Sequence, residues 1–254
     1  MDMYKELTES AKLHEYVYHY TNFNALEEIL KNNSLRLSRL DKVNDSLENS
    51  RISQLWNTKI FVLCFTYGLD NSKYFFENYG TIQLKFKVKD INIKQIYFDS
   101  ELNNPMKKIS DQGFVSDLNC KTYDDKNWRI FDSTFSDVYY TDSLEKHKDE
   151  NGDEQNAGLI KLKLGYDNDN HLRNWSQEKE TRLRVAVRPI GLEFALDEKN
   201  KIFYPKPKFK YIYVELPKIE EIRISLNEND FNVCDGYYIK TLLDAYGLLD
   251  KLHM

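Results

Sequence analysis

YHYTNFNALEEIL, residues 18–30, joins the end of a predicted strand to the start of a predicted helix. Aromatic and branched residues at 14–20 are typical of a strand. Polar residues at 21–24 can cap a helix whose apolar positions recur at 23, 26, 29 and 30. His19 therefore lies beside a helix N-terminus, where free N–H groups and the helix dipole favour phosphate. We interpret this junction as a candidate nucleotide-binding position.

WSQEKETR, residues 175–182, is the second informative stretch, because it places Glu178 and Glu180 at the start of a predicted strand. Side chains two residues apart on an extended segment lie on the same face. Two carboxylates there could serve a catalytic site. They could equally pair with Arg182 or Arg184 on that face as a structural ion-pair network.

The rest of the chain predicts an α+β fold with one mixed central sheet and flanking helices, forming a single domain over residues 1–254. Strands are predicted at 34–38, 60–66, 81–88, 93–98, 181–188, 210–216 and 219–225, and helices at 72–79 and 237–252. The continuous apolar run at 60–66 is typical of a central strand. In the C-terminal helix we expect Leu242, Leu243, Tyr246 and Leu249 to face inward. Residues 103–158 are predicted to be an insertion of helices and loops, with an exposed loop at 146–156.

Composition narrows the classes of function. The chain has 254 residues, a net charge of −5 and only 9 glycines, and it contains neither a P-loop nor a GxGxxG motif. The three cysteines lack the spacing of a zinc site or a disulfide framework, so we expect reduced thiols and no metal. The N-terminus lacks the apolar segment of a signal peptide, and the longest apolar run is too short to span a membrane. We therefore expect a cytoplasmic protein with no membrane partner.

Four motifs, in this order, resemble a bacterial family called domain of unknown function 2971. They are residues 18–21 (YHYT), 44–48 (NDSLE), 64–66 (CFT) followed by 79–80 (YG), and 175–182 (WSQEKETR). The resemblance covers roughly residues 16–226. The family name itself implies no activity.

A second, looser resemblance is to the His-Tyr-Glu group of ADP-ribosyltransferases. It lies in His19 and the helix and short strand that follow, in Thr66 and Tyr79, and in the acidic pair Glu178 and Glu180. It implies a split-sheet cleft that takes NAD as a substrate without a metal. The implied NAD-binding residues are His19, Tyr20, Thr21, Thr66 and Tyr79, and the implied catalytic residues are Glu180, Glu178 and His19. The chain differs from the group at Tyr20, where the group has Gly, and in a long unmatched segment before residue 175.

The chemistry is consistent with these residue types. Cleavage of the glycosidic bond of NAD develops positive charge on the ribosyl group, which a nearby carboxylate stabilises. An aromatic ring can stack on nicotinamide, and a histidine can hydrogen-bond a ribose or an amide. Glu180 is the favoured catalytic carboxylate because it lies deeper in the predicted strand, and Glu178 would then position the acceptor.

The leading hypothesis is an NAD-dependent ADP-ribosyltransferase-like enzyme. Its resemblance suggests a toxin or phage-defence effector that modifies a protein or nucleic-acid acceptor. One alternative is a catalytically silent module of the same fold that binds a nucleotide or a protein, and another is a metal-independent hydrolase using His19 with a glutamate. Individual residues also have structural interpretations: His19 as a core histidine bonded to a backbone carbonyl, Tyr79 as a core residue, and Cys64 as a small buried residue or, with His19, a nucleophile pair. The oligomeric state stays open.

Overall fold

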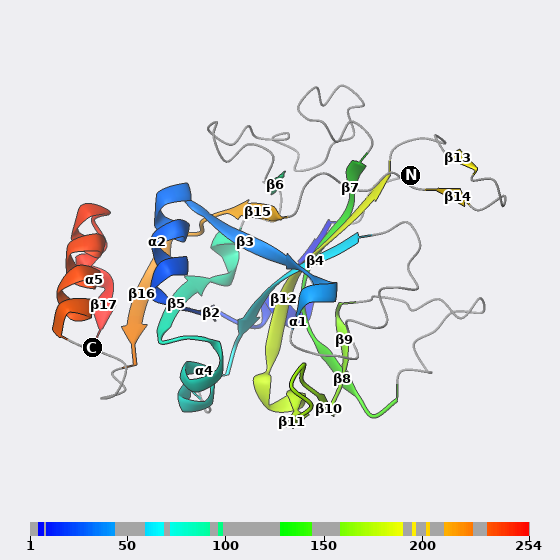
Figure 1. Cartoon of the computed structure of the whole chain (residues 1–254), viewed down its shortest axis with the longest axis horizontal. Coiled ribbons are helices and arrows are strands. Elements are labelled where there is room, and N and C mark those ends of the chain that lie inside the picture. The colour runs from blue at the N-terminus through cyan, green and yellow to red at the C-terminus, as the bar shows by residue number, and fades with distance from the viewer. Residues whose placement is uncertain are drawn as a thin grey trace.

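A branched sheet of eleven strands forms the centre of the structure, which is a computed structural model (Figure 1). The structure describes residues 5–7, 9–43, 59–68, 72–91, 96–98, 128–143, 158–189, 195–196, 202–203, 211–225 and 233–253. Along its main path the sheet runs β1 (Lys5–Leu7), β7 (Trp128–Asp137), β12 (Glu180–Pro189), β4 (Lys59–Thr66), β2 (Tyr16–Thr21), β5 (Ile82–Lys87), β16 (Ile219–Ile224) and β17 (Leu252–His253). The pairs at the two ends, β1 with β7 and β16 with β17, are parallel and the others antiparallel. The predicted mixed central sheet is confirmed.

The sheet forks at β4, the strand predicted to be central. One edge of β4 pairs with β12 along its whole length. Its other edge pairs with β3 (Ser34–Arg39) at Phe61 and Val62, and with β2 only at Thr66. One branch continues from β2 to β5, and the other from β3 to β15 (Ile212–Glu215) and β6 (Ile96–Phe98). The two branches therefore diverge on either side of Cys64.

Helix α2 (Phe23–Asn32) connects the two branches, and local signals define both of its ends. The Asn22 side chain accepts a hydrogen bond from the backbone N–H of Ala25 at 2.9 Å. Asn33 ends the helix in the left-handed conformation, with φ of 47°. The predicted polar cap is confirmed, because short polar side chains satisfy terminal N–H groups. Asn is suited to the left-handed end because it tolerates positive φ.

The remaining elements surround this sheet. The other helices are α1 (Glu9–Lys12), α4 (Ser72–Tyr79) and α5 (Val233–Ala245), with 3₁₀ turns at Leu40–Lys42, Val88–Asp90, Trp175–Glu178 and Leu249–Lys251. Three two-stranded sheets pair β8 (Tyr139–Thr141) with β9 (Ile160–Leu162), β10 (Leu164–Tyr166) with β11 (Leu172–Asn174), and β13 (Ala195–Leu196) with β14 (Ile202–Phe203). Among the described helices, none has the length and apolar character needed to cross a membrane.

Alternation along β4 and β12 separates the core from the candidate site. Leu63 pairs with Leu183, and both side chains join the main apolar core. Their neighbours Cys64 and Arg182 pair with each other and face the opposite side, as the period of two in a strand requires. Leu183, Val185 and Val187 of β12 all belong to the main apolar core, as this alternation requires.

The prediction of helices and loops at 103–158 is wrong for residues 128–141, which form β7 and β8. Strand β7 lies between β1 and β12, yet its sequence is rich in polar residues. Those residues find partners across the strands: Thr181 donates to Asp137 at 2.6 Å, and Arg184 pairs with Asp132. Residues 103–127 and 144–157, including the predicted loop at 146–156, lie outside the described part of the chain.

The C-terminal helix also differs from its prediction. It spans Val233–Ala245 and ends before Gly247, whose φ of +65° is typical of a helix terminus. The chain then continues through a 3₁₀ turn into β17, which pairs with β16. Leu243 is buried as predicted, but Tyr246 and Leu249 are 44% and 42% exposed because they follow the end of the helix.

Gly80 fixes the approach of α4 to β2, and we expect Gly80→Ala to cost at least about 3 kcal/mol of unfolding free energy. Its φ is +128°, and a Cβ there would lie 2.3 Å from the Thr21 carbonyl oxygen. Gly247→Ala is the matched control, since φ is also positive but no atom lies within 4 Å, and it should cost only about 1 kcal/mol. Urea unfolding measures both. Equal losses would show that the contact with Thr21 has no effect.

Candidate functional site

A cavity of about 150 Å³ lies on the face of β4 and β12 that is turned away from the main core. Six of the seven residues predicted from the sequence line it, namely His19, Tyr20, Thr66, Tyr79, Glu178 and Glu180. The seventh, Thr21, lines a second cavity of about 430 Å³ beside α2 and β3. His19 lines both cavities. The structure thus places His19 and Glu180 in one cleft, as the sequence predicts.

Aromatic side chains form one wall of the cavity. Tyr20 stacks on Phe75 of α4, with ring centroids 5.0 Å apart and an angle of 20° between the planes. The Tyr20 hydroxyl accepts a hydrogen bond from Gln83. Tyr20 therefore acts as a packing residue that holds α4 against β2, and this packing places Tyr79, at the end of α4, beside the cavity.

His19 fills the fork of the sheet. Its Nδ1 lies 3.0 Å from the carbonyl oxygen of Cys64, at the part of β4 between its pairings with β3 and β2. The ring thus donates to a backbone carbonyl in this part of β4, which confirms the interpretation of a histidine bonded to the backbone. Burial lowers the pKa of His19, which favours the neutral ring. With Nδ1 as the donor, Nε2 is the nitrogen that can accept a hydrogen bond.

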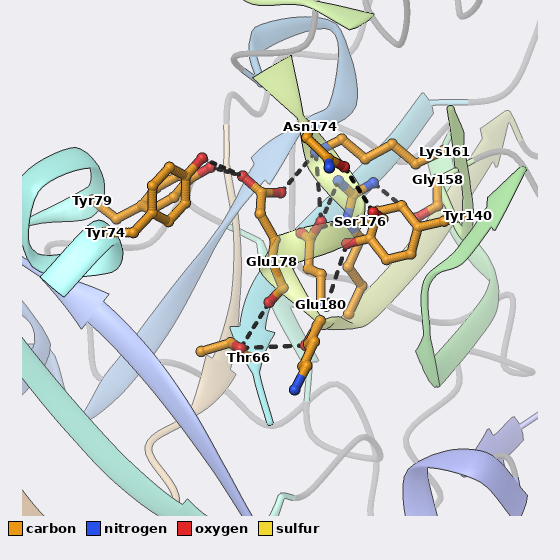
Figure 2. Close-up of polar contacts among 12 residues, drawn as sticks. Thr66, Tyr74, Tyr79, Tyr140, Gly158, Lys161, Asn174, Ser176, Glu178 and Glu180 are labelled. Carbon is orange, nitrogen blue, oxygen red and sulfur yellow. Dashed lines mark hydrogen bonds and ion pairs between the residues drawn. The ribbon is translucent and has the colours of Figure 1, made fainter. Parts of the chain in front are cut away.

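Glu178 and Glu180 belong to a buried charge cluster together with Lys161 and Arg182. Figure 2 labels Glu178, Glu180 and Lys161 of this cluster. Arg182 binds both oxygens of Glu180, at 2.7 and 3.0 Å, and donates to the carbonyl oxygen of Gly158 at 3.0 Å. The Lys161 ammonium lies 3.0 Å from Glu178 and 3.7 Å from Glu180. The structural pairing of Glu180 with Arg182, left open by the sequence, is therefore present.

The hydroxyl groups of α4 complete the surroundings of Glu178. Tyr79 donates a hydrogen bond to Oε1 of Glu178, and the Tyr74 hydroxyl lies 3.4 Å from the same oxygen. Figure 2 shows Glu178 between these two tyrosines on one side and Lys161 on the other. Tyr79 is 39% exposed, so its interpretation as a core residue is wrong.

The pKa values of the two carboxyl groups are shifted in opposite directions. Burial alone would raise the pKa of Glu180, but Arg182 and Lys161 outweigh it and hold that pKa at about 2. Burial raises the pKa of Glu178, and the nearby charge of Glu180 adds to this against the opposing effect of Lys161. The cluster therefore contains one firmly ionised carboxylate and one whose charge is easier to neutralise.

Thr66 and Lys179 shape the segment that presents the two glutamates. Glu178 ends a 3₁₀ turn, Lys179 adopts a left-handed conformation with φ of 43°, and the strand begins at Glu180. The prediction of one extended segment is thus wrong for Glu178. Thr66 donates to the carbonyl oxygen of Glu178 at 2.7 Å and fixes this turn against the end of β4.

Cys64 lies in the same cavity, but it does not form a nucleophile pair with His19. The histidine ring contacts the carbonyl oxygen of Cys64, whereas the thiol bonds the carboxylate of Glu180. Burial and the charge of Glu180 raise the pKa of this thiol well above 9.0. A thiol held protonated is a poor nucleophile.

Lys161 lines the cavity, but the sequence did not predict it as a site residue. It lies in β9, and its ammonium is 4.0 Å from the centre of the Trp175 ring. The signal that could have found it is a single lysine within the apolar run at 159–162. Such a lysine is buried only when it is paired.

Asp167, Asp169 and His171 could together hold a metal ion by their spacing. Their oxygens and nitrogens lie in the turn between β10 and β11, not in the lining of the cavity. The buried Asp167 accepts hydrogen bonds from the backbone of Asp169 and His171 and from Arg173 at 2.8 Å. These hydrogen bonds explain why Asp167 is buried: its side chain organises the turn.

Comparison with known proteins identifies no relative: no family model, no curated protein and no solved structure matches the chain.

The predicted motif at 44–48 lies outside the described residues.

Proposed function

We propose that the protein is an ADP-ribosyltransferase-like enzyme that uses NAD as a substrate. The observation that carries the proposal is the meeting of His19, Tyr79 and the two glutamates in one aromatic-walled cavity, although they are far apart in the sequence. In the reaction, the bond between ribose and nicotinamide breaks and nicotinamide leaves with the bonding electrons. A nucleophile of the acceptor then bonds to the ribose carbon and releases its proton.

The size and position of the cavities support this proposal. A cavity of about 150 Å³ holds one aromatic ring, which suits nicotinamide but not a whole dinucleotide. The second, larger cavity contains the N-terminal end of α2 and shares His19 with the first. We propose that the fork between β2 and β3 corresponds to the split-sheet cleft of the transferase group. An extended dinucleotide could then occupy both cavities, with phosphate near the helix terminus.

A carboxylate at the first cavity would stabilise the positive charge that develops on the ribose. Tyr79 and Tyr74 would help to orient that carboxylate through their hydroxyl groups. The role as a toxin or phage-defence effector in the cytoplasm, acting on a protein or nucleic-acid acceptor, is proposed from the resemblance alone.

A second candidate is a catalytically silent nucleotide-binding module of the same fold. It is favoured by the pairing of both carboxylates with buried cations, which leaves the cluster with no net charge. The hydrolase alternative has less support, because the cavity has aromatic walls instead of a wide polar groove.

We expect NAD to raise the melting temperature. A ligand that binds only the native state at about 100 times its dissociation constant stabilises it by roughly 2.7 kcal/mol. Thermal unfolding with NAD, with nicotinamide alone and with ADP-ribose alone shows which half of NAD the protein binds. Release of nicotinamide from NAD distinguishes an enzyme from a catalytically silent module. If millimolar NAD produces neither a thermal shift nor nicotinamide, the proposal is wrong.

A further inference from the structure

We propose that Lys161 is a positioning residue that holds Glu178 as the working carboxylate of the cavity, and that Glu180 is the fixed anchor of Lys161. The role of Glu178 in turnover rests on the proposed function. The positioning by Lys161 does not, because it can be measured without any ligand. This assignment reverses the preference for Glu180 that the sequence alone suggests.

The carboxylate of Glu180 is fixed in place by the protein itself. Both of its oxygens are bound by Arg182, and Arg182 is itself tied to the backbone at Gly158. The thiol of Cys64 adds another donor to the same carboxylate. Bidentate binding of a carboxylate by arginine fixes geometry as well as charge. Both oxygens of Glu180 are thus held by a partner within the protein, although the residue lines the cavity.

Lys161 holds only one oxygen of Glu178. Its ammonium contacts Oε2 at 3.0 Å, while the ring of Trp175 supports the lysine from 4.0 Å. Within the described part of the chain, the hydrogen-bond partners of the other oxygen, Oε1, are the hydroxyl groups of Tyr74 and Tyr79. A hydroxyl rotates easily and both donates and accepts, so it can yield Oε1 to a substrate hydroxyl or share it. Tyr79 and Glu178 both line the cavity, so a ligand there would lie beside this pair.

Lys161 also favours the ionised form of the Glu178 carboxyl group. Among the described residues, the titratable groups that interact with Glu178 are Tyr74 and Tyr79 of α4, Tyr140 of β8, Lys161 of β9 and Glu180 of β12. Lys161 is the cation among them that contacts Glu178 directly. Without it, burial and the charge of Glu180 would both favour the protonated carboxyl. A protonated Glu178 could not stabilise a cationic ribosyl group.

The test follows the carboxyl titrations of the whole chain by NMR with ¹³C-labelled glutamate. Glu178→Gln and Glu180→Gln assign the two signals. In Lys161→Met we expect the titration midpoint of Glu178 to rise by at least about one pH unit, a tenfold change. Lys161→Arg should restore it, because the charge is kept. Lys163→Met is the matched control, since this exposed neighbour pairs with Asp142 outside the cavity, and it should leave the midpoint unchanged.

Activity supplies the second readout. The acid limb of the pH profile of nicotinamide release from NAD should move upward with the Glu178 midpoint, and kcat should fall more than KM rises. If Lys161→Met does not fold, the ¹⁵N signal of the Lys161 ammonium in the wild type decides the question. That signal should shift at the pH where Glu178 titrates, and this step should disappear in Glu178→Gln.

An unchanged Glu178 midpoint in folded Lys161→Met, or a Lys161 signal that ignores Glu178, would overturn the inference. Absence of nicotinamide release by the wild type would instead overturn the proposed function, while the titrations would still decide the positioning.

Discussion

Glu180→Gln is expected to lose about 3–5 kcal/mol of unfolding free energy, because it leaves a buried arginine without its charged partner. Arg182 is 1% exposed, and two of its nitrogen atoms donate hydrogen bonds to Glu180. A neutral amide offers one acceptor oxygen, so one of these donors loses its partner. Urea unfolding at pH 7 measures the loss.

Glu77→Gln is the matched control for this variant. Glu77 pairs with Lys73 at 3.8 Å on the surface of α4, where an ion pair contributes about 0.3–0.5 kcal/mol. The same chemical change should therefore cost little. A Glu180→Gln protein with wild-type stability and lost turnover of NAD would contradict this assignment and restore Glu180 as the catalytic carboxylate.

The stability that Glu180 contributes has a defined pH range. Its pKa falls from the ordinary value of 4.5 to about 2 in the folded protein. A group with a lowered folded pKa contributes stability that is fully present above the unfolded value and is lost as the pH falls through the folded value. The stability difference between the wild type and Glu180→Gln should therefore narrow between about pH 4.5 and about pH 2.

Glu178→Gln is expected to lower the rate of nicotinamide release from NAD by about 100-fold or more, the effect of removing a key electrostatic group from an active site. Its cost in stability should be smaller than that of Glu180→Gln. Burial raises the pKa of Glu178, so the fold already disfavours its charge, and Lys161 keeps Glu180 as a partner.

The two glutamine variants, measured side by side, separate the roles. We expect Glu178→Gln to be folded and inactive, and Glu180→Gln to be destabilised. Tyr79→Phe serves as the control within the cavity, because it removes a hydroxyl but keeps both carboxylates, and it should lower the rate less than Glu178→Gln. A fully active Glu178→Gln protein would exclude Glu178 as the working carboxylate.

The elements with strong local signals were predictable from the sequence. The polar residues that cap α2, the apolar run of β4 and the alternation of β12 each determine structure within about ten residues. Strand β7 could not be predicted in this way. Its polar residues are satisfied by Arg184 and Thr181 of another strand, and a pairing at that separation leaves no local pattern.

The same division applies to the site. The sequence by itself determined which residue types are available: a histidine at a strand end, a tyrosine at the end of a helix and two glutamates beside an arginine. It also determined that Glu180 and Arg182 share a face of the strand.

Only the tertiary structure decided which charge meets which. Lys161 comes from another strand and lies between Glu178 and Glu180, and α4 brings the hydroxyl of Tyr79 to Glu178. The reason is physical: the charge state of a buried carboxyl depends on burial and on partners within a few ångströms. The packing of distant segments sets those partners. Neither Lys161 nor Tyr79 lies in the stretch of sequence around Glu178 and Glu180.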